Sequence, residues 1–191
     1  MRKVDAGRGG AIDASPGPGA ASVRGTYKAN MKTNPGLRVG LVSDTHGLLR
    51  PEARAFLIGS DYIVHGGDVG DPKILEELAA VAPLIAVRGN NDAAPWAARL
   101  RRTELIRVGS VFVYVIHNLA ELDLDPRAAG VRVIVSGHSH KPSVEERGGI
   151  LYVNPGSCGP KRFKLPISVG EIVVSGSAVK ARTVDLRAGV H

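Results

Sequence analysis

The sequence has a single cysteine, Cys158, among its 191 residues. One cysteine excludes an intramolecular disulfide framework and any zinc site built from several cysteines. The chain also lacks an apolar run approaching the roughly 18 residues that indicate a membrane-spanning helix. No apolar stretch of the kind found in secretory signals follows the basic residues near its start. We therefore expect a cytoplasmic protein without a membrane partner.

A strong net charge is missing from most of the chain as well. The formal net charge is +7, but residues 1–36 hold six basic and two acidic side chains, whereas the other residues hold 19 basic and 16 acidic ones. The excess therefore says little about the partners of the domain that follows. A nucleic-acid-binding tail would need interleaved aromatic residues, and only Tyr27 is available. We expect nucleic acid at most as a substrate.

Residues 1–36 differ from the rest in composition. Eighteen of them are Gly, Ala, Pro or Ser, and few are large and apolar. Such a segment cannot offset its ordering entropy by burial, so we predict a disordered, basic extension followed by one domain over residues 37–191. Two alternatives stay open: Met31 is the true start, or the extension is a basic arm that contacts anionic partners.

Between residues 37 and 87, short apolar runs alternate with helical patterns. This alternation predicts a parallel sheet whose strands are connected by helices. Strands are predicted at 37–43, 61–65 and 83–87, and helices at 50–58 and 71–82. Beyond Leu105 the apolar runs follow one another through glycine turns at Gly109, Gly148 and Gly176, which indicates hairpins. A second sheet packed against the first is the expected result.

Five polar segments lie directly after predicted strands. They are SDTHG (43–47), GGDVGD (66–71), RGNND (88–92), IHN (116–118) and SGHSH (136–140). In open α/β sheets, ligands bind beyond the carboxyl ends of the strands. Asp44 and His46 are two residues apart, as are His138 and His140, so each pair points to one face of an extended segment. These segments are the candidate functional site.

The side chains in these segments offer carboxylate, amide and imidazole ligands. The candidate ligands are Asp44, His46, Asp68, Asn90, His117, His138 and His140. Seven ligands are too many for one ion and suit two divalent ions bridged by Asp68, an arrangement used for displacement at phosphorus. Mixed oxygen and nitrogen ligands favour Mn²⁺, Fe²⁺, Zn²⁺ or Ni²⁺ over Mg²⁺ or Ca²⁺. We expect Mn²⁺ first, with Ni²⁺, Zn²⁺ and Fe²⁺ as alternatives.

In the order DxH, GD, GN, H, GHxH, the segments resemble the calcineurin-like metallophosphoesterase superfamily. The sequences VRGNND and NPGS (154–157) resemble its small bacterial and archaeal phosphodiesterase branch, to which the retromer subunit Vps29 is also similar. The resemblance covers about residues 37–175. It implies an α/β fold, a four-layer α/β/β/α sandwich of two mixed sheets, with a di-metal site at the ends of the sheets.

The resemblance also implies roles for individual residues. Asp44, His46, Asp68 and His140 would hold one metal ion, and Asp68, Asn90, His117 and His138 the other. In this family a hydroxide that bridges the ions attacks phosphorus in line, which implies a metal-dependent phosphodiesterase acting on a small phosphodiester. Asn90 or Arg88 would contact a phosphoryl oxygen, and Asp92 would orient a ligand without binding an ion.

Two positions depart from the family pattern. Asn91 stands where many members have a histidine that protonates the leaving group and where the small branch usually has cysteine. An amide cannot supply that proton at neutral pH, which predicts slow hydrolysis, good leaving groups or another acid. The usual HGH block reads His117-Asn118-Leu119, which affects the expected loop geometry and substrate contacts. The alternative function is therefore a catalytically weak, Vps29-like scaffold or binding protein with a retained metal site.

The substrate is left open among cyclic nucleotides, nucleotide diesters, oligonucleotide ends and lipid-derived diesters. Specificity is expected from residues 93–104 and 117–130. Three further residues are predicted to serve structure: His65 to support a ligand, and Trp96 and Cys158 to pack in the core. The sequence does not predict the oligomeric state.

Overall fold

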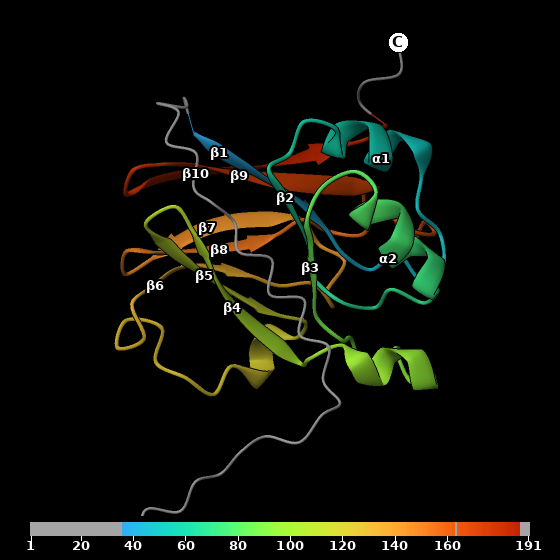
Figure 1. Ribbon diagram of the computed structural model, residues 1–191, viewed down its shortest axis with the longest axis horizontal. Coiled ribbons are helices and arrows are strands. Elements are labelled where there is room, and N and C mark those ends of the chain that lie inside the picture. Colours follow the sequence, from blue (N-terminus) through green and yellow to red (C-terminus); the bar gives the residue numbers. More distant parts are fainter. Residues whose placement is uncertain (1–35, 163, 188–191) are drawn as a thin grey trace, which may run out of the picture. The chain divides into compact units, whose positions relative to one another are not determined.

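The computed structural model describes residues 36–162 and 164–187, and Figure 1 shows their arrangement. The extension predicted over residues 1–36 lies outside the described residues, apart from Gly36. Among the described residues, no helix is both long and apolar enough to cross a membrane.

The first sheet contains the parallel strands that the alternating pattern predicts. Its order is β10-β9-β1-β2-β3, with β1 paired in parallel to β2 and β2 in parallel to β3, while β9 runs antiparallel to β1 and to β10. The strand bounds are Leu37–Val42 (β1), Tyr62–His65 (β2), Leu84–Ala86 (β3), Ser168–Ser175 (β9) and Ala178–Asp185 (β10). The sheet is mixed because the carboxyl-terminal hairpin β9–β10 extends a parallel core.

Two short helices cover one face of this sheet. They are α1 (Pro51–Leu57) and α2 (Pro72–Ala79), which lie together on the same side in Figure 1. Proline at the first position suits both starts, and Asp71 caps α2 by accepting a hydrogen bond from the Lys73 N–H over 2.9 Å. Their buried side chains, among them Leu57 and Leu78, pack with Cys158 and the partly buried Trp96. The packing predicted for Cys158 and Trp96 matches these contacts.

The second sheet forms from the runs that follow residue 100. Its order is β4-β5-β6-β8-β7, with bounds Thr103–Val108 (β4), Val111–Ile116 (β5), Val131–Val135 (β6), Ser143–Arg147 (β7) and Ile150–Asn154 (β8). The predicted glycine turns join β4 to β5, β7 to β8 and β9 to β10. Gly109, Gly148 and Gly176 have φ values of 59°, 57° and 60°, which glycine adopts without steric cost.

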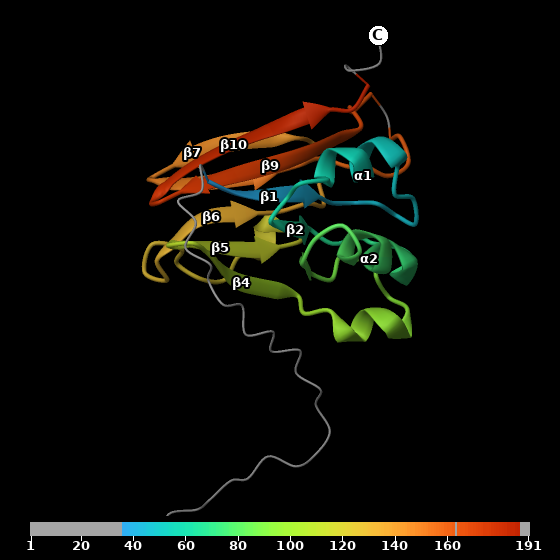
Figure 2. The ribbon, with the colours of Figure 1, turned by 45° about the horizontal axis from the view of Figure 1, so that its top comes forward.

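The two sheets lie against each other (Figure 2), and the side chains between them form a core made mostly of valine. Val39 and Leu41 of the first sheet pack in one cluster with Val113, Val133 and other inward side chains of the second. Alternate residues of the strands face opposite ways, so the even-numbered Tyr114, Ile116 and Ile134 form a separate cluster on the outer face of the second sheet.

The fourth layer consists of the segment between β5 and β6. Leu119, Leu122 and Leu124 from this segment cover the outer cluster of the second sheet. The layer is thin, because its helical part is the single 3₁₀ turn η2 (Leu119–Glu121). The predicted four-layer α/β/β/α sandwich of two mixed sheets is therefore confirmed, with most of its helical mass on the first sheet.

One charged cluster joins the strands of the first sheet to α1. Arg38 Nε donates to Glu171 over 2.5 Å, and Arg182 Nε donates to the other carboxylate oxygen over 2.6 Å. The Arg38 guanidinium also donates to the carbonyls of Phe56 and Ile58 at the end of α1. Burial alone would raise the pKa of Glu171, but the two arginines outweigh it and hold that pKa below its ordinary value.

Replacing Glu171 with glutamine is expected to lower the free energy of unfolding by about 1–2 kcal/mol, because both arginines lose a charged acceptor. A shift of about 2–6 °C in Tm follows for a domain of this size. Since the native-state pKa is lowered, the stabilisation is present at neutral pH and disappears as the pH falls below the ordinary glutamate range. Thermal melts of both proteins between about pH 7 and pH 3 should show the difference shrinking as the pH falls below the ordinary glutamate pKa.

The matched control is Glu145→Gln, which breaks the exposed ion pair with Arg147. Exposed pairs contribute about 0–1 kcal/mol, so this variant should melt close to the parent. A constant difference between parent and Glu171→Gln across the pH range would contradict the assigned charge coupling.

Candidate metal centre

The five polar segments converge beyond the carboxyl ends of β1, β2, β3, β5 and β6. Backbone hydrogen bonds align the first two segments: the Asp44 N–H donates to Gly67 O over 3.0 Å, and the His46 N–H to Asp68 O over 2.9 Å. The fifth segment joins them through the His138 N–H, which donates to Asp44 Oδ2 over 3.1 Å. The convergence that parallel strands imply is therefore present.

Backbone conformation distinguishes these residues from the rest of the fold. Within the described part of the chain, every non-glycine residue with positive φ is a predicted metal ligand: Asp44 (55°), His46 (45°), Asp68 (56°), His138 (66°) and His140 (57°). This left-handed conformation costs about 1–2 kcal/mol for an ordinary L-residue, although aspartate and histidine adopt it more readily than most. Such strain concentrates at functional sites, where the surrounding structure holds it in place.

The first group of ligand atoms contains Asp44, His46 and His140. Asp44 Oδ1 lies 3.3 Å from His140 Nε2 and 3.9 Å from His46 Nε2, and the two imidazole nitrogens are 3.3 Å apart. The two rings are stacked, with centroids 5.1 Å apart. Three ligand atoms thus face a common point from two different loops, as the predicted first metal site requires.

The second group gathers around Asn90. Its Oδ1 lies 3.0 Å from His117 Nε2 and 2.9 Å from His138 Nδ1. His117 Nδ1 donates to the Gly66 carbonyl over 2.7 Å, so Nε2 is the nitrogen left to face Asn90. Asn90 and His138 are exposed, so this side of the centre is open to solvent.

Asp68 stands between the two groups. Its Oδ2 lies 3.5 Å from His117 Nε2 and 3.8 Å from His46 Nε2. The structure therefore brings all seven predicted ligands into one constellation, with Asp68 between the two groups.

The protonation states of His46, His140 and Asp68 suit cation binding. Burial lowers the pKa of His46 and lowers that of His140 to about 4, which leaves both imidazoles neutral near pH 7. Burial alone would raise the pKa of Asp68, but the facing His117 imidazole and hydrogen bonds from Asn91 outweigh it and hold that pKa well below its usual range. Burial would likewise lower the pKa of His117, but the facing carboxylate of Asp68 outweighs it and raises that pKa. Neutral imidazole and ionised carboxylate are the forms that bind metals.

The residues present fit divalent cations. Asp44 Oδ1 is buried and has no hydrogen-bond partner among the described residues, although two imidazole nitrogens face it. Burial raises the pKa of this carboxyl to about 6, because the charged form loses its hydration. A neighbouring cation would stabilise the charged form and lower the pKa again. A buried acceptor aimed at other ligand atoms is the environment expected of a metal site, because an unpaired buried charge is otherwise costly.

Glycines allow the loops to approach the carboxylates closely. A Cβ added at Gly89 would overlap the Asp68 carboxylate, and one added at Gly137 would overlap Ser43 Oγ and lie 2.8 Å from Asp44 Oδ2. A larger residue at either position would therefore clash with the groups that form the site.

Two further residues support the ligand loops. Asp92 accepts hydrogen bonds from the N–H groups of Gly70 (3.0 Å) and Gly89 (2.9 Å), so it ties two loops together, in keeping with its predicted orienting role. His65 is fully buried; Nδ1 accepts from the Gly67 N–H and Nε2 contacts Thr45 Oγ1 at 2.9 Å. Burial lowers its pKa to about 4, so it stays neutral.

The two positions that depart from the family pattern have defined contacts. Asn91 donates twice to the Asp68 carboxylate, from its N–H to Asp68 Oδ1 (2.8 Å) and from Nδ2 to Asp68 Oδ2 (2.6 Å). Asn118 Oδ1 accepts from the Ala120 N–H over 3.1 Å and so caps η2. Sequence reasoning missed both roles, because each depends on which way an amide side chain turns.

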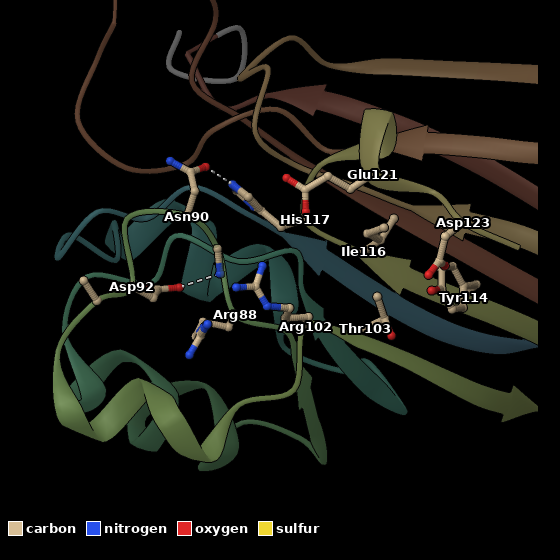
Figure 3. Close-up of a pocket in the computed structure, with 12 residues that line it drawn as sticks. Arg88, Asn90, Asp92, Arg102, Thr103, Tyr114, Ile116, His117, Glu121 and Asp123 are labelled. Atoms are coloured by element: carbon tan, nitrogen blue, oxygen red, sulfur yellow. Dashed lines mark hydrogen bonds between the residues drawn. The ribbon is translucent and has the colours of Figure 1, made fainter.

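A pocket of about 640 Å³ opens beside the second group (Figure 3). Asn90 and His117 form one edge, and both segments expected to give specificity contribute to it: Arg102 and Thr103 from one, Glu121 and Asp123 from the other. The sequence singled out those segments but not these side chains, since their convergence requires β4 and η2 to be placed in space.

The family model of the calcineurin-like phosphoesterase superfamily domain matches residues 37–176. The chain belongs to this superfamily. It is 34% identical to a probable metallophosphoesterase of Methanothermobacter thermautotrophicus over 165 residues, covering 80% of this chain and 94% of that one. It is 29% identical to the phosphodiesterase YfcE of Escherichia coli K12 over 164 residues, covering 70% and 86%.

Among solved structures, the Vps29 protein of Cryptosporidium parvum superposes with a TM-score of 0.70. The match is 24% identical and covers 81% of this chain and 94% of that one. At this identity the likeness shows the metallophosphoesterase fold. The superfamily and the likeness to Vps29 that the motifs predict are thus confirmed.

Replacing Asn91 with alanine is expected to weaken Mn²⁺ binding by about 10-fold, because the Asp68 carboxylate loses one of the two bonds that orient it. Titration calorimetry with chelator-stripped protein measures this directly. Asn118→Ala is the control, since Asn118 bonds to Glu121 and Ala120 rather than to a predicted ligand. Equal affinity in parent and Asn91→Ala would show that Asn91 does not orient the bridge.

Proposed function

We propose that the protein is a di-metal-dependent phosphodiesterase that hydrolyses a small phosphodiester. The observation that carries the proposal is the position of the Asp68 carboxylate between two ligand groups, where it faces both His46 and His117. The groups are Asp44, His46 and His140 on one side and Asn90, His117 and His138 on the other, and Asp44 also lies near Asp68 and His117. The names of the relatives, metallophosphoesterase and phosphodiesterase, support the same reaction class.

Two bound divalent ions, with Mn²⁺ the first choice, would supply a bridging hydroxide at neutral pH and neutralise charge on both oxygens of an in-line displacement. The protein's own contribution is to hold the ligand groups in fixed geometry. Asp92 and His65 tie the loops together, and Asn91 orients Asp68. Asn90 and Arg88 border the pocket, where either can contact a phosphoryl oxygen.

The contacts of Asn91 favour diesters with good leaving groups. Its amide is turned toward Asp68, so it offers no proton to a departing alkoxide. General acid catalysis commonly contributes about 10²–10⁴-fold, so the missing group predicts slow turnover of unactivated esters. The same observation favours the second candidate, a catalytically weak scaffold or binding protein that retains its metal site.

Chelator-stripped protein is expected to hydrolyse bis(p-nitrophenyl) phosphate only after Mn²⁺ is added, because the ligand groups need the ions to generate the nucleophile. The monoester p-nitrophenyl phosphate, measured in parallel, should be cleaved more slowly. Release of p-nitrophenol gives both rates. Bound metal without turnover on either ester would favour the scaffold.

Asp68→Ala is expected to abolish both metal binding and turnover, because the shared ligand is lost. Metal content after dialysis, measured by atomic emission, and the diester assay test the two effects separately. Asp71→Ala, which removes only the cap of α2, is the control and should bind metal and turn over normally. Normal activity in Asp68→Ala would overturn the metal-centre assignment.

A further inference from the structure

The pocket beside the metal centre carries opposite charges at opposite ends. Figure 3 shows Arg88 and Arg102 on the side of Asp92, and Asp123 with Tyr114 at the far end. Glu121 lies between His117 and the far end. The volume of about 640 Å³ is in the range of sites that take a ligand the size of a nucleotide.

These charges are not consumed by internal ion pairs. Among the described residues, the side chains of Arg88, Arg102 and Asp123 have no hydrogen-bond or ion-pair partner, and Glu121 accepts only from Asn118 Nδ2 over 3.2 Å. The neighbouring Arg101 differs, since it is 78% exposed and pairs with Glu104 at 3.7 Å outside this pocket. Two guanidinium groups without a partner among the described residues, and two carboxylates without an ion pair, are thus available to a ligand.

The pocket offers little for stacking a base. Tyr114 is its only aromatic lining residue apart from His117, and it is 6% exposed. Trp96 packs with the helices instead. Proteins that recognise bases on a flat surface use exposed aromatic rings, so this pocket favours contacts to sugar and phosphate.

We propose that the pocket selects a phosphodiester in which one arm is a sugar bearing a second phosphate, as in a 5′-phosphorylated dinucleotide. This proposal rests on the proposed function, because the scissile phosphate must sit at Asn90 and His117. Arg88 and Arg102 bind the second phosphate, which the planar guanidinium matches with two parallel hydrogen bonds, and of the two candidates for the scissile phosphoryl oxygen this leaves Asn90. Glu121 or Asp123 accepts a hydrogen bond from the 2′-hydroxyl, the one free hydroxyl of that sugar, as acidic residues do for ribose in dinucleotide sites.

The test compares two substrates that differ only by the terminal phosphate, diadenylate (ApA) and 5′-phosphorylated diadenylate (pApA). The Mn²⁺-loaded protein should cleave pApA with a kcat/KM about 10-fold or more above that for ApA, since a bidentate charged contact contributes at least this factor. In the double variant Arg88→Ala/Arg102→Ala this ratio should fall to about one. Chromatographic separation of the products gives both rates.

Arg101→Ala is the matched control. It removes the same charge from the next position along the chain but lies outside the pocket, so the pApA/ApA ratio should stay at the parent value. An unchanged ratio in the double variant, or equal loss in Arg101→Ala, would overturn the role of the two pocket arginines.

A binding measurement gives a readout that does not depend on turnover. Adenosine 3′,5′-bisphosphate should bind more tightly than adenosine 3′-monophosphate in calorimetry, and the double arginine variant should remove the difference. Asp123→Asn, with Glu121→Gln, should weaken both ligands together, because the acidic end contacts the sugar. Uridine dinucleotides should behave like the adenosine ones within about 3-fold, since the pocket lacks a stacking surface.

The two proposals fail in different ways. Absence of any Mn²⁺-dependent cleavage of bis(p-nitrophenyl) phosphate would remove the proposed function itself. Cleavage of that ester together with equal or no cleavage of pApA and ApA would keep the phosphodiesterase and overturn the specificity. A strong preference for adenine over uracil would show that the base, and not the phosphorylated sugar, is what the pocket recognises.

Discussion

The two buried carboxylates at the ends of β1 and β2 are the constraint on which the rest of this structure depends. Asp44 and Asp68 are almost inaccessible to solvent, and each adopts the left-handed conformation in the loop that follows its strand. A buried carboxylate is costly unless donors or cations face it. Asp68 obtains two donors from Asn91 and one facing imidazole, whereas Asp44 keeps one oxygen without a partner. That asymmetry makes Asp44 the residue with most to gain from a cation.

The fold stabilises the ligand residues in a strained, left-handed backbone conformation. Five left-handed ligands at about 1 kcal/mol each would amount to a large part of the 5–15 kcal/mol by which a domain is stable. They persist because their loops are short, bonded to one another through the backbone and seated on two sheets that share a densely buried valine core. Gly89 and Gly137 complete the arrangement, since any side chain there would push the carboxylates apart. The stability of the two packed sheets thus offsets the conformational strain of the ligand loops.

Most of this fold could be predicted from the sequence because its signals are local. The alternation of apolar runs and helical patterns predicts β1 to β3 with α1 and α2, and the glycine turns predict all three hairpins. The segments of the candidate site could also be predicted from the sequence, since aspartate and histidine two residues apart directly after a strand are typical of metal ligands. The directions of individual side chains, in contrast, could not be predicted from the sequence. Asn91 turns to Asp68, and Arg102 enters the pocket while Arg101 turns away. These directions depend on long-range packing, which no local pattern encodes.

The departure from the family pattern at Asn91 fits the charged pocket beside the ligand groups. Asn91 donates two hydrogen bonds to the Asp68 carboxylate and offers no proton to a leaving group. A phosphodiesterase of the proposed kind would therefore gain rate mainly by holding its substrate well, because binding energy from groups remote from the reacting atoms can be used for orientation. The unpaired charges of the adjoining pocket are suited to that task. Such an enzyme is expected to be narrow in substrate range, and to cleave small synthetic esters more slowly than a diester whose second arm fills the pocket.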